Sequence, residues 1–203
     1  MQSATGARLP DRRTIERKET LPCLHARIAF RDVSRATDSR TVRAALLPPK
    51  VVLTNTAPYL VWPRGDEHDQ AFLLGVLCSM PLDWYVRRFV ETHLNFFIFN
   101  PLPVPRPPRT SRHWQRVVAL AGRLACPDKR FGAWAKAIGV ECGPIAEDEK
   151  EDAVAELDAI VARLYGLTEP QLVHVLETFH EGWDPGKRLE AVLGHFRAWD
   201  RRP

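Results

Sequence analysis

The sequence predicts an α+β protein, built from a small twisted sheet (mixed or antiparallel) with a helix pair and a C-terminal helical segment. Two patterns support this fold class. Short apolar runs with a period of two, or bounded by prolines, occupy residues 26–62, whereas apolar residues at helical spacing recur after Pro108. With 203 residues, 45% of them hydrophobic, the chain is long enough to bury a core of its own.

The predicted sheet begins with four short strands. Ile28 and Phe30 alternate with polar or small neighbours, and Val42, Ala44 and Leu46 alternate in the same way before two prolines. A polar turn separates these two runs, and the further apolar runs are short. Because the connections are short, we expect an antiparallel or mixed sheet. The four predicted strands cover residues 26–31, 41–47, 51–53 and 59–62.

A helix pair and one more strand are predicted next. Acidic residues from Asp66 onward suit a helix N-terminus, and Pro81 can occupy the first turn of a second helix. Residues 96–99 are apolar without alternation, which favours a strand buried on both faces. The chain then meets prolines that cannot donate to a sheet, so pairing must end there. These prolines are Pro101, Pro103 and Pro105.

Everything beyond Pro108 is predicted to be helical. Ser111 can cap one helix, and the acidic run at 147–152 can begin another, with Gly166 after its end. Thr168 and Gln171 have the spacing of a capping box. Shorter apolar stripes at 131–138 and 189–196 complete the helical segment.

These patterns divide the chain into three regions. We expect a flexible N-terminal segment at 1–23, a sheet-based recognition core at 24–108 and a helical segment at 109–203. The first residues lack the apolar stretch of a secretory signal, and no apolar run approaches a membrane span of about 20 residues. The four cysteines fit neither a zinc-binding nor a disulfide pattern, so we expect reduced thiols in a cytoplasmic protein without membrane contact.

Charge is distributed unevenly along the chain. Residues 1–50 carry 11 Lys and Arg against 5 Asp and Glu, and residues 106–136 carry 8 against 1. Residues 137–203 are acidic, with 7 against 14. Two basic blocks therefore flank the aromatic run at 96–99, which suits contact with a polyanion but equally suits solvated arginines.

The motifs of several enzyme classes are missing. No glycine-rich turn follows a predicted strand, as binding of S-adenosylmethionine would require. Residues 100–103, Asn-Pro-Leu-Pro, lack the second consecutive proline and the aromatic residue of the tetrapeptide that holds an extrahelical adenine. The seven histidines form no paired metal-binding motif, and there is no P-loop. We therefore assign no catalytic residue, no metal ligand and no cofactor to this chain.

Two alternatives to a DNA-recognition role remain open. Asp128, Asp148 and Lys150 fit the formula of a metal-dependent nuclease, although the last two lie in a charge run rather than in an apolar strand. Alternatively, the chain could be a protein-interaction module without DNA contact. In that module, the partner surface would be covered by Trp62, Trp84 and Trp114.

The favoured hypothesis is nucleic-acid binding by polar residues of the sheet region. Arginines from the first two predicted strands and the turn between them can share one rim and hold phosphates. Asparagines in turns or at strand ends can pair with base edges or phosphates. The candidate DNA-binding residues are Arg27, Arg31, Arg35, Arg40, Arg43, Asn55, Arg64, Asn95 and Asn100.

The order of several motifs resembles the C-terminal target-recognition region of large adenine-specific DNA methyltransferases. These are type IIG restriction–modification enzymes and the related methyltransferases of BREX- and DISARM-type phage defence. The matching segments, over about 24–108 and 153–200, are Arg27-Ile28-Ala29-Phe30-Arg31-Asp32-Val33, Arg40-Thr41 through Pro48-Pro49, Asn55, Tyr59-Leu60, Leu94-Asn95, Leu102-Pro103-Val104-Pro105, Val161 to Thr168 and His174 to Phe179.

The resemblance implies recognition of double-stranded DNA for an adenine-N6 methyltransferase of a restriction–modification or phage-defence system. It lends this chain no activity, because the catalytic half and its cofactor-binding residues lack counterparts here. S-adenosylmethionine is expected only in a catalytic partner or a missing half. The chain is then either the terminal fragment of a split or truncated gene or a stand-alone specificity unit.

Overall fold

The computed structural model describes residues 21–61, 65–179 and 185–200. The expected flexible segment at 1–23 therefore lies largely outside the described residues. The elements in chain order are η3 (Pro22–Leu24), β1 (Arg27–Phe30), β2 (Ala44–Leu47), α2 (Glu67–Leu77), α3 (Met80–Val86), α4 (Phe96–Phe99), α5 (Arg112–Ala125), η4 (Lys129–Phe131), α6 (Gly132–Ile138), α7 (Glu147–Leu164), α8 (Glu169–Glu177) and α9 (Pro185–Asp200).

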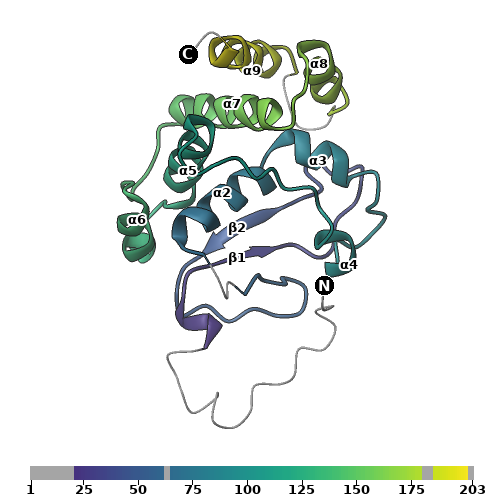
Figure 1. Ribbon diagram of the computed structural model, residues 1–203. Helices are drawn as coiled ribbons and strands as arrows, with labels where there is room; N and C mark the ends of the chain where they lie inside the picture. Colours follow the sequence, from purple (N-terminus) through teal and green to yellow (C-terminus); the bar gives the residue numbers. More distant parts are fainter. Residues whose placement is uncertain (1–20, 62–64, 180–184, 201–203) are drawn as a thin grey trace.

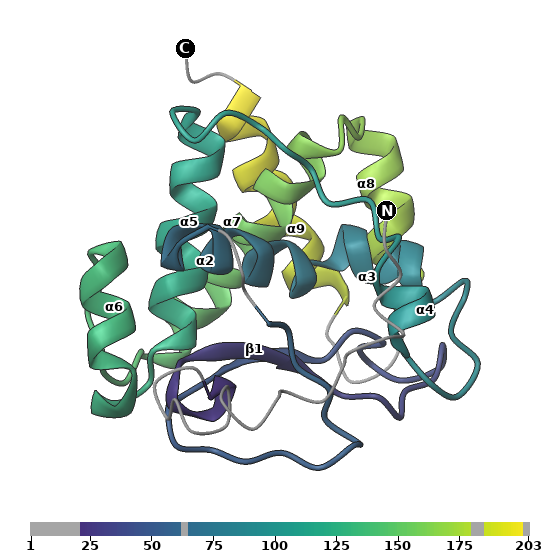
Figure 2. The same cartoon turned by 60° about the horizontal axis from the view of Figure 1, so that its bottom comes forward.

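The helices are stacked on one face of a small sheet, which confirms the predicted α+β class. Figure 1 shows β1 and β2 below, α2 and α3 above them, then α7, with α8 and α9 at the top. Figure 2, in which the bottom is turned forward, shows α6 and α4 at opposite ends of the molecule. None of the helices in the described part of the chain has the length and apolar content needed to cross a membrane.

The sheet has two antiparallel strands over the described residues, fewer than the sequence predicted. β1 and β2 pair from Arg27 opposite Leu47 to Phe30 opposite Ala44. The prediction of strands at 51–53 and 59–62 was wrong for the residues described. Residues 56–60 run beside β1 but form a single bridge, between Ala29 and Tyr59, because Pro58 has no N–H to donate.

Residues 96–99 form the short helix α4, so the prediction of a buried strand there was also wrong. The Asn95 side chain accepts a hydrogen bond from the backbone N–H of Ile98 and thereby caps the helix. Phe96 and Phe99, three positions apart, share one helix face and pack on Phe30 of β1. The Phe30 and Phe99 rings stack with centroids 4.2 Å apart, and Phe96 meets Phe30 edge-on at 5.5 Å.

The predicted helix boundaries are confirmed where a specific capping residue indicated them. Asp66 forms a capping box at the start of α2, and Ser111 accepts from the Trp114 N–H at the start of α5. Thr168 and Gln171 form the capping box of α8. Gly166, just after α7, adopts a φ of +70°, a left-handed conformation that favours glycine.

The main hydrophobic core contains residues of the sheet, of the helix pair α2 and α3, and of the helices after Pro108. It contains Ile28 and Phe30 from β1, Leu77 from α2 and Val117 from α5. α2 and α5 approach closely at Gly75, where an added Cβ would lie 2.8 Å from Val117 Cγ1. This glycine is therefore required by the packing of the two helices.

A buried carboxylate on α3 fixes the segment that leads into β2. The Asp83 side chain is fully buried and accepts hydrogen bonds from the backbone N–H groups of Thr41 and Val42, at 3.1 and 2.6 Å. The guanidiniums of Arg40 and Arg87 lie 3.8 and 3.3 Å from its oxygens. Asp83 thus has both backbone donors and two cationic partners, as a buried carboxylate requires.

Two more acidic side chains connect the helical layers. Asp158 on α7 is fully buried and accepts from the Met80 N–H of α3 at 2.8 Å and from Arg188 of α9 at 2.6 Å. Glu156, also on α7, accepts from Arg116 of α5 and from the Trp199 indole of α9. α7 is therefore the helix to which α3, α5 and α9 are tied by polar contacts.

We expect Asp83→Asn to lower the free energy of unfolding by about 3 kcal/mol, because it leaves Arg40 and Arg87 without a buried counter-charge. Urea denaturation followed by circular dichroism measures the change. The matched control is Asp128→Asn, which removes an exposed ion pair with Arg130 and should leave stability unchanged. Equal stability of the two variants would contradict the structural role of Asp83.

We also expect the acid sensitivity of folding to depend on Glu156. Burial opposes ionisation of this carboxyl, but the hydrogen bonds and charge of Arg116 outweigh burial and hold its pKa below the usual 4.5. The contribution of Glu156 to stability is therefore present above about pH 4.5 and is lost as pH falls through the lower folded-state pKa. Unfolding free energies from pH 6 to pH 3 should fall less for Glu156→Gln than for the wild type.

Candidate nucleic-acid interface

Two of the nine candidate residues, Arg27 and the half-buried Arg40, use their guanidiniums inside the fold. Arg27 is 4% exposed, and its guanidinium donates to the carbonyl oxygens of Pro22, His25 and Val51. Arg40 donates to the Cys78 carbonyl at 2.6 Å and faces Asp83. A guanidinium removed from water needs hydrogen-bond acceptors, and the fold supplies them here. These two side chains are therefore engaged within the protein.

Arg31 and Arg43 lie opposite each other where β1 and β2 continue beyond their paired residues. The Arg31 N–H donates to the Arg43 carbonyl at 3.0 Å, in line with the β1–β2 register. Residues directly opposite in an antiparallel pair point to the same face of the sheet. Both side chains are exposed, and Phe30, the neighbour of Arg31, points to the other face, into the core.

The turn that carries Asn55 and the segment that carries Asn95 meet β1 at the same place. The Asp32 N–H donates to the Thr56 carbonyl at 3.1 Å, and the Asp32 carbonyl accepts from the Leu94 N–H at 2.7 Å. Asn55 precedes Thr56 and Asn95 follows Leu94 in the sequence, and both asparagines are exposed. The structure thus gathers Arg31, Arg43, Asn55 and Asn95 around the end of β1.

The remaining candidates have more varied positions. Arg35 is exposed in the turn before β2, where Asp38 accepts from its backbone N–H and pairs with the Arg43 guanidinium at 3.5 Å. Asn100 is exposed at the C-terminal end of α4. Arg64 lies outside the described residues. We call Arg31, Arg35, Arg43, Asn55 and Asn95 the polar rim.

Acidic side chains lie among the basic ones of the rim, and each of them has a partner. Asp32 lies 2.9 Å from the Nδ1 of His93, and Asp38 is engaged by Arg43. The guanidiniums of Arg31 and Arg35 have no hydrogen-bond or ion-pair partner among the described residues. These two guanidiniums are therefore the rim cations most available to an external anion.

The structure adds two features that the sequence did not predict. His93 pairs with Asp32, and Phe97 of α4 is 90% exposed beside Asn95. The helical state of 96–99 had a signal in the sequence, since Asn95 is a favoured N-cap residue and Pro101 a favoured stop. The His93–Asp32 pair joins residues 61 positions apart and had no sequence signal.

The residues of the two alternative functions do not assemble into sites. Asp128 caps η4 and pairs with Arg130, while Lys150 on α7 pairs with Glu147. No three His, Cys, Asp or Glu side chains in the described ranges are grouped to hold a metal ion. Of the tryptophans, Trp114 is buried, Trp84 is half-buried and Trp62 is not described.

An apolar cavity of about 290 Å³ lies between β2, α2 and α5. Leu46, Leu74, Leu124 and Phe131 contribute to its lining, and Cys78 supplies a thiol that donates to the Ala44 carbonyl at 3.5 Å. Small-molecule sites usually add several convergent polar groups to an apolar lining. This cavity has no such set, so it does not define a site.

Comparison of the chain with known proteins found no matching family model, no matching curated protein and no matching solved structure.

We expect Cys78 and Cys126 to resist alkylation in the folded protein. Burial raises the pKa of Cys78 to about 11, and burial together with the neighbouring Cys142 raises that of Cys126 to about 12. Both thiols are then protonated at pH 8, whereas iodoacetamide reacts with thiolates. Peptide mass spectrometry should find both unmodified in buffer and modified in urea; rapid native labelling of Cys126 would contradict the structure.

Proposed function

We propose that the chain recognises a specific sequence of double-stranded DNA on behalf of an adenine-N6 DNA methyltransferase of a restriction–modification or phage-defence system. The observation that carries the proposal is the polar rim. In it, Arg31 and Arg43 share one exposed face near the turn of Asn55 and near Asn95 at the start of α4. Arginines can contact phosphates and turn amides can read base edges, so the rim offers both kinds of group together.

The order of motifs in the sequence supports the methyltransferase context. In this proposal, S-adenosylmethionine and the catalytic residues belong to a partner subunit or to another part of a longer chain. The chain would act in the cytoplasm, where the DNA of a defence system is located. The C-terminal helices, tied together through α7, would dock this catalytic partner or brace the sheet behind the rim.

The double variant Arg31→Glu/Arg43→Glu should weaken duplex binding at least about tenfold and reduce the slope of log affinity against log salt by about two, because two phosphate contacts are lost. Fluorescence anisotropy with a labelled duplex, from low to high salt, measures both effects. The affinity of the isolated chain is expected to be weak and to fall steeply with salt.

The matched control is Arg130→Glu/Lys136→Glu, which makes the same change in net charge at and next to α6, at the opposite end of the molecule from α4 (Figure 2). The control should bind DNA like the wild type. If the rim variant and the control lose affinity equally, binding reflects net charge alone. If the rim variant keeps its affinity, the rim does not contact DNA.

A further inference from the structure

Four aromatic side chains are exposed at the end of the molecule formed by α3, the following loop and α4. Phe97 is 90% exposed, Phe89 53%, Phe96 41% and Tyr85 39%. Figures 1 and 2 both place α3 and α4 at this end. We call these four residues the aromatic corner.

The exposure of Phe97 means that its ring contributes little to the stability of the fold. An exposed phenylalanine on its own needs no explanation, but a group of four at one place indicates a contact surface. The short helix that carries Phe97 is held in place, because its Phe96 and Phe99 rings pack against Phe30 of β1. A side chain on a backbone that is already fixed loses little conformational entropy when it binds a ligand.

The corner is continuous with the polar rim. A β-bridge joins Val33 to His93, and the Leu94 N–H donates to the carbonyl of Asp32, the residue after Arg31, at 2.7 Å. Asn95 is the residue that caps α4 and precedes Phe96 and Phe97. The helix that carries Phe97 therefore begins two residues after Leu94, which contacts the neighbour of Arg31.

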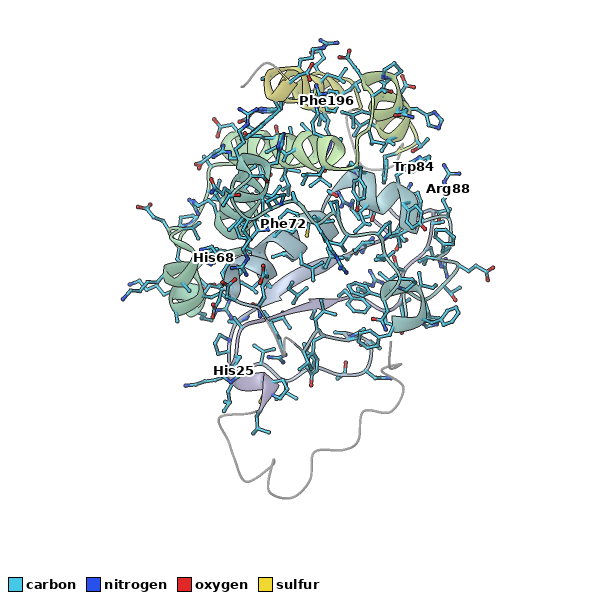
Figure 3. All side chains as sticks on the ribbon, viewed as in Figure 1. His25, His68, Phe72, Trp84, Arg88 and Phe196 are labelled. Carbon is cyan, nitrogen blue, oxygen red and sulfur yellow. The ribbon has the colours of Figure 1, made fainter. Side chains whose placement is uncertain are left out.

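The charges around the corner favour a polyanion over an apolar protein surface. Arg31, Arg35 and Arg88 are exposed here against Glu91, and the carboxylate of Asp32 is paired with His93. Figure 3 shows Trp84 and Arg88 together at the outer end of α3, where the guanidinium lies 4.1 Å from the ring centroid. Aromatic rings beside arginines are typical of surfaces that stack nucleobases.

We propose that the aromatic corner, with Phe97 at its tip, stacks on an unpaired nucleobase of the DNA whose phosphates contact the polar rim. This inference rests on the proposed function and adds a second mode of contact to it. An aromatic ring can stack on any base, since every base has a π face, so the corner contributes affinity for a distorted or opened duplex rather than for one base.

The test compares two labelled duplexes, one intact and one with a single unpaired 2-aminopurine. The wild type should bind the second more tightly and change its 2-aminopurine emission, which reports stacking. Phe97→Ala should weaken binding of this duplex at least about fivefold and abolish the emission change. Val52→Ala, which shortens an 84% exposed side chain elsewhere, is the matched control and should behave like the wild type.

Two further variants separate stacking from apolar contact. Phe97→Trp should preserve the affinity and the emission change, whereas Phe97→Leu, which keeps an apolar side chain without a π face, should lose them. If Phe97→Ala or Phe97→Leu behaves like the wild type, the stacking proposal is overturned. Light scattering adds a check: a dimer that Phe97→Ala dissociates would make the corner a self-association surface and overturn the proposal.

The outcomes distinguish this inference from the function on which it rests. Suppose that the rim variant Arg31→Glu/Arg43→Glu no longer binds the intact duplex, while Phe97→Ala binds both duplexes with wild-type affinity. The stacking proposal then fails and DNA recognition stands. If the wild type binds neither duplex at low salt, both proposals fail.

Discussion

The buried carboxylate of Asp83 is the constraint on which the sheet region depends. It receives two backbone N–H groups from the segment that leads into β2, so the start of that strand is positioned by α3 rather than by sheet pairing alone. A two-stranded sheet is marginal without such support. Because a buried negative charge requires compensation, Arg40 and Arg87 are drawn inward, and Arg43, three residues after Arg40, is left on the outer face.

This division of the arginines limits what the basic composition means. Arg27 and Arg40 satisfy buried carbonyls and a buried carboxylate, so they count toward the basic block but not toward the surface. Of the five arginines between residues 27 and 43, Arg31, Arg35 and Arg43 stay exposed. The exposed basic surface is narrower than the sequence predicted. It also contains Asp32, which contacts His93, and Asp38, which pairs with Arg43.

Local signals in the sequence predicted the helices well and the sheet only in part. Asp66, Ser111 and Thr168 act within three residues of their own position, so their capping roles are visible in a linear sequence. The run at 96–99 was ambiguous, since a short apolar segment suits a strand or a helix, and its partner Phe30 is distant in the chain. The inward direction of Arg27 and Arg40 likewise depends on acceptors contributed by tertiary packing, at Val51 and Asp83.

The helical conformation of residues 96–99 exposes Phe97 close to the start of α4, where Asn95 of the polar rim lies. As a strand buried on both faces, residues 96–99 would have placed all four side chains in the core. As a helix, the segment turns Phe99 into the core, sets Phe96 at its edge against Phe30 and leaves Phe97 outside. Since Phe30 immediately precedes Arg31, the same β1 residues that anchor the aromatic corner also position the polar rim. Phosphate contact and base stacking would then be set at a fixed separation by the strand itself, without a flexible linker between them.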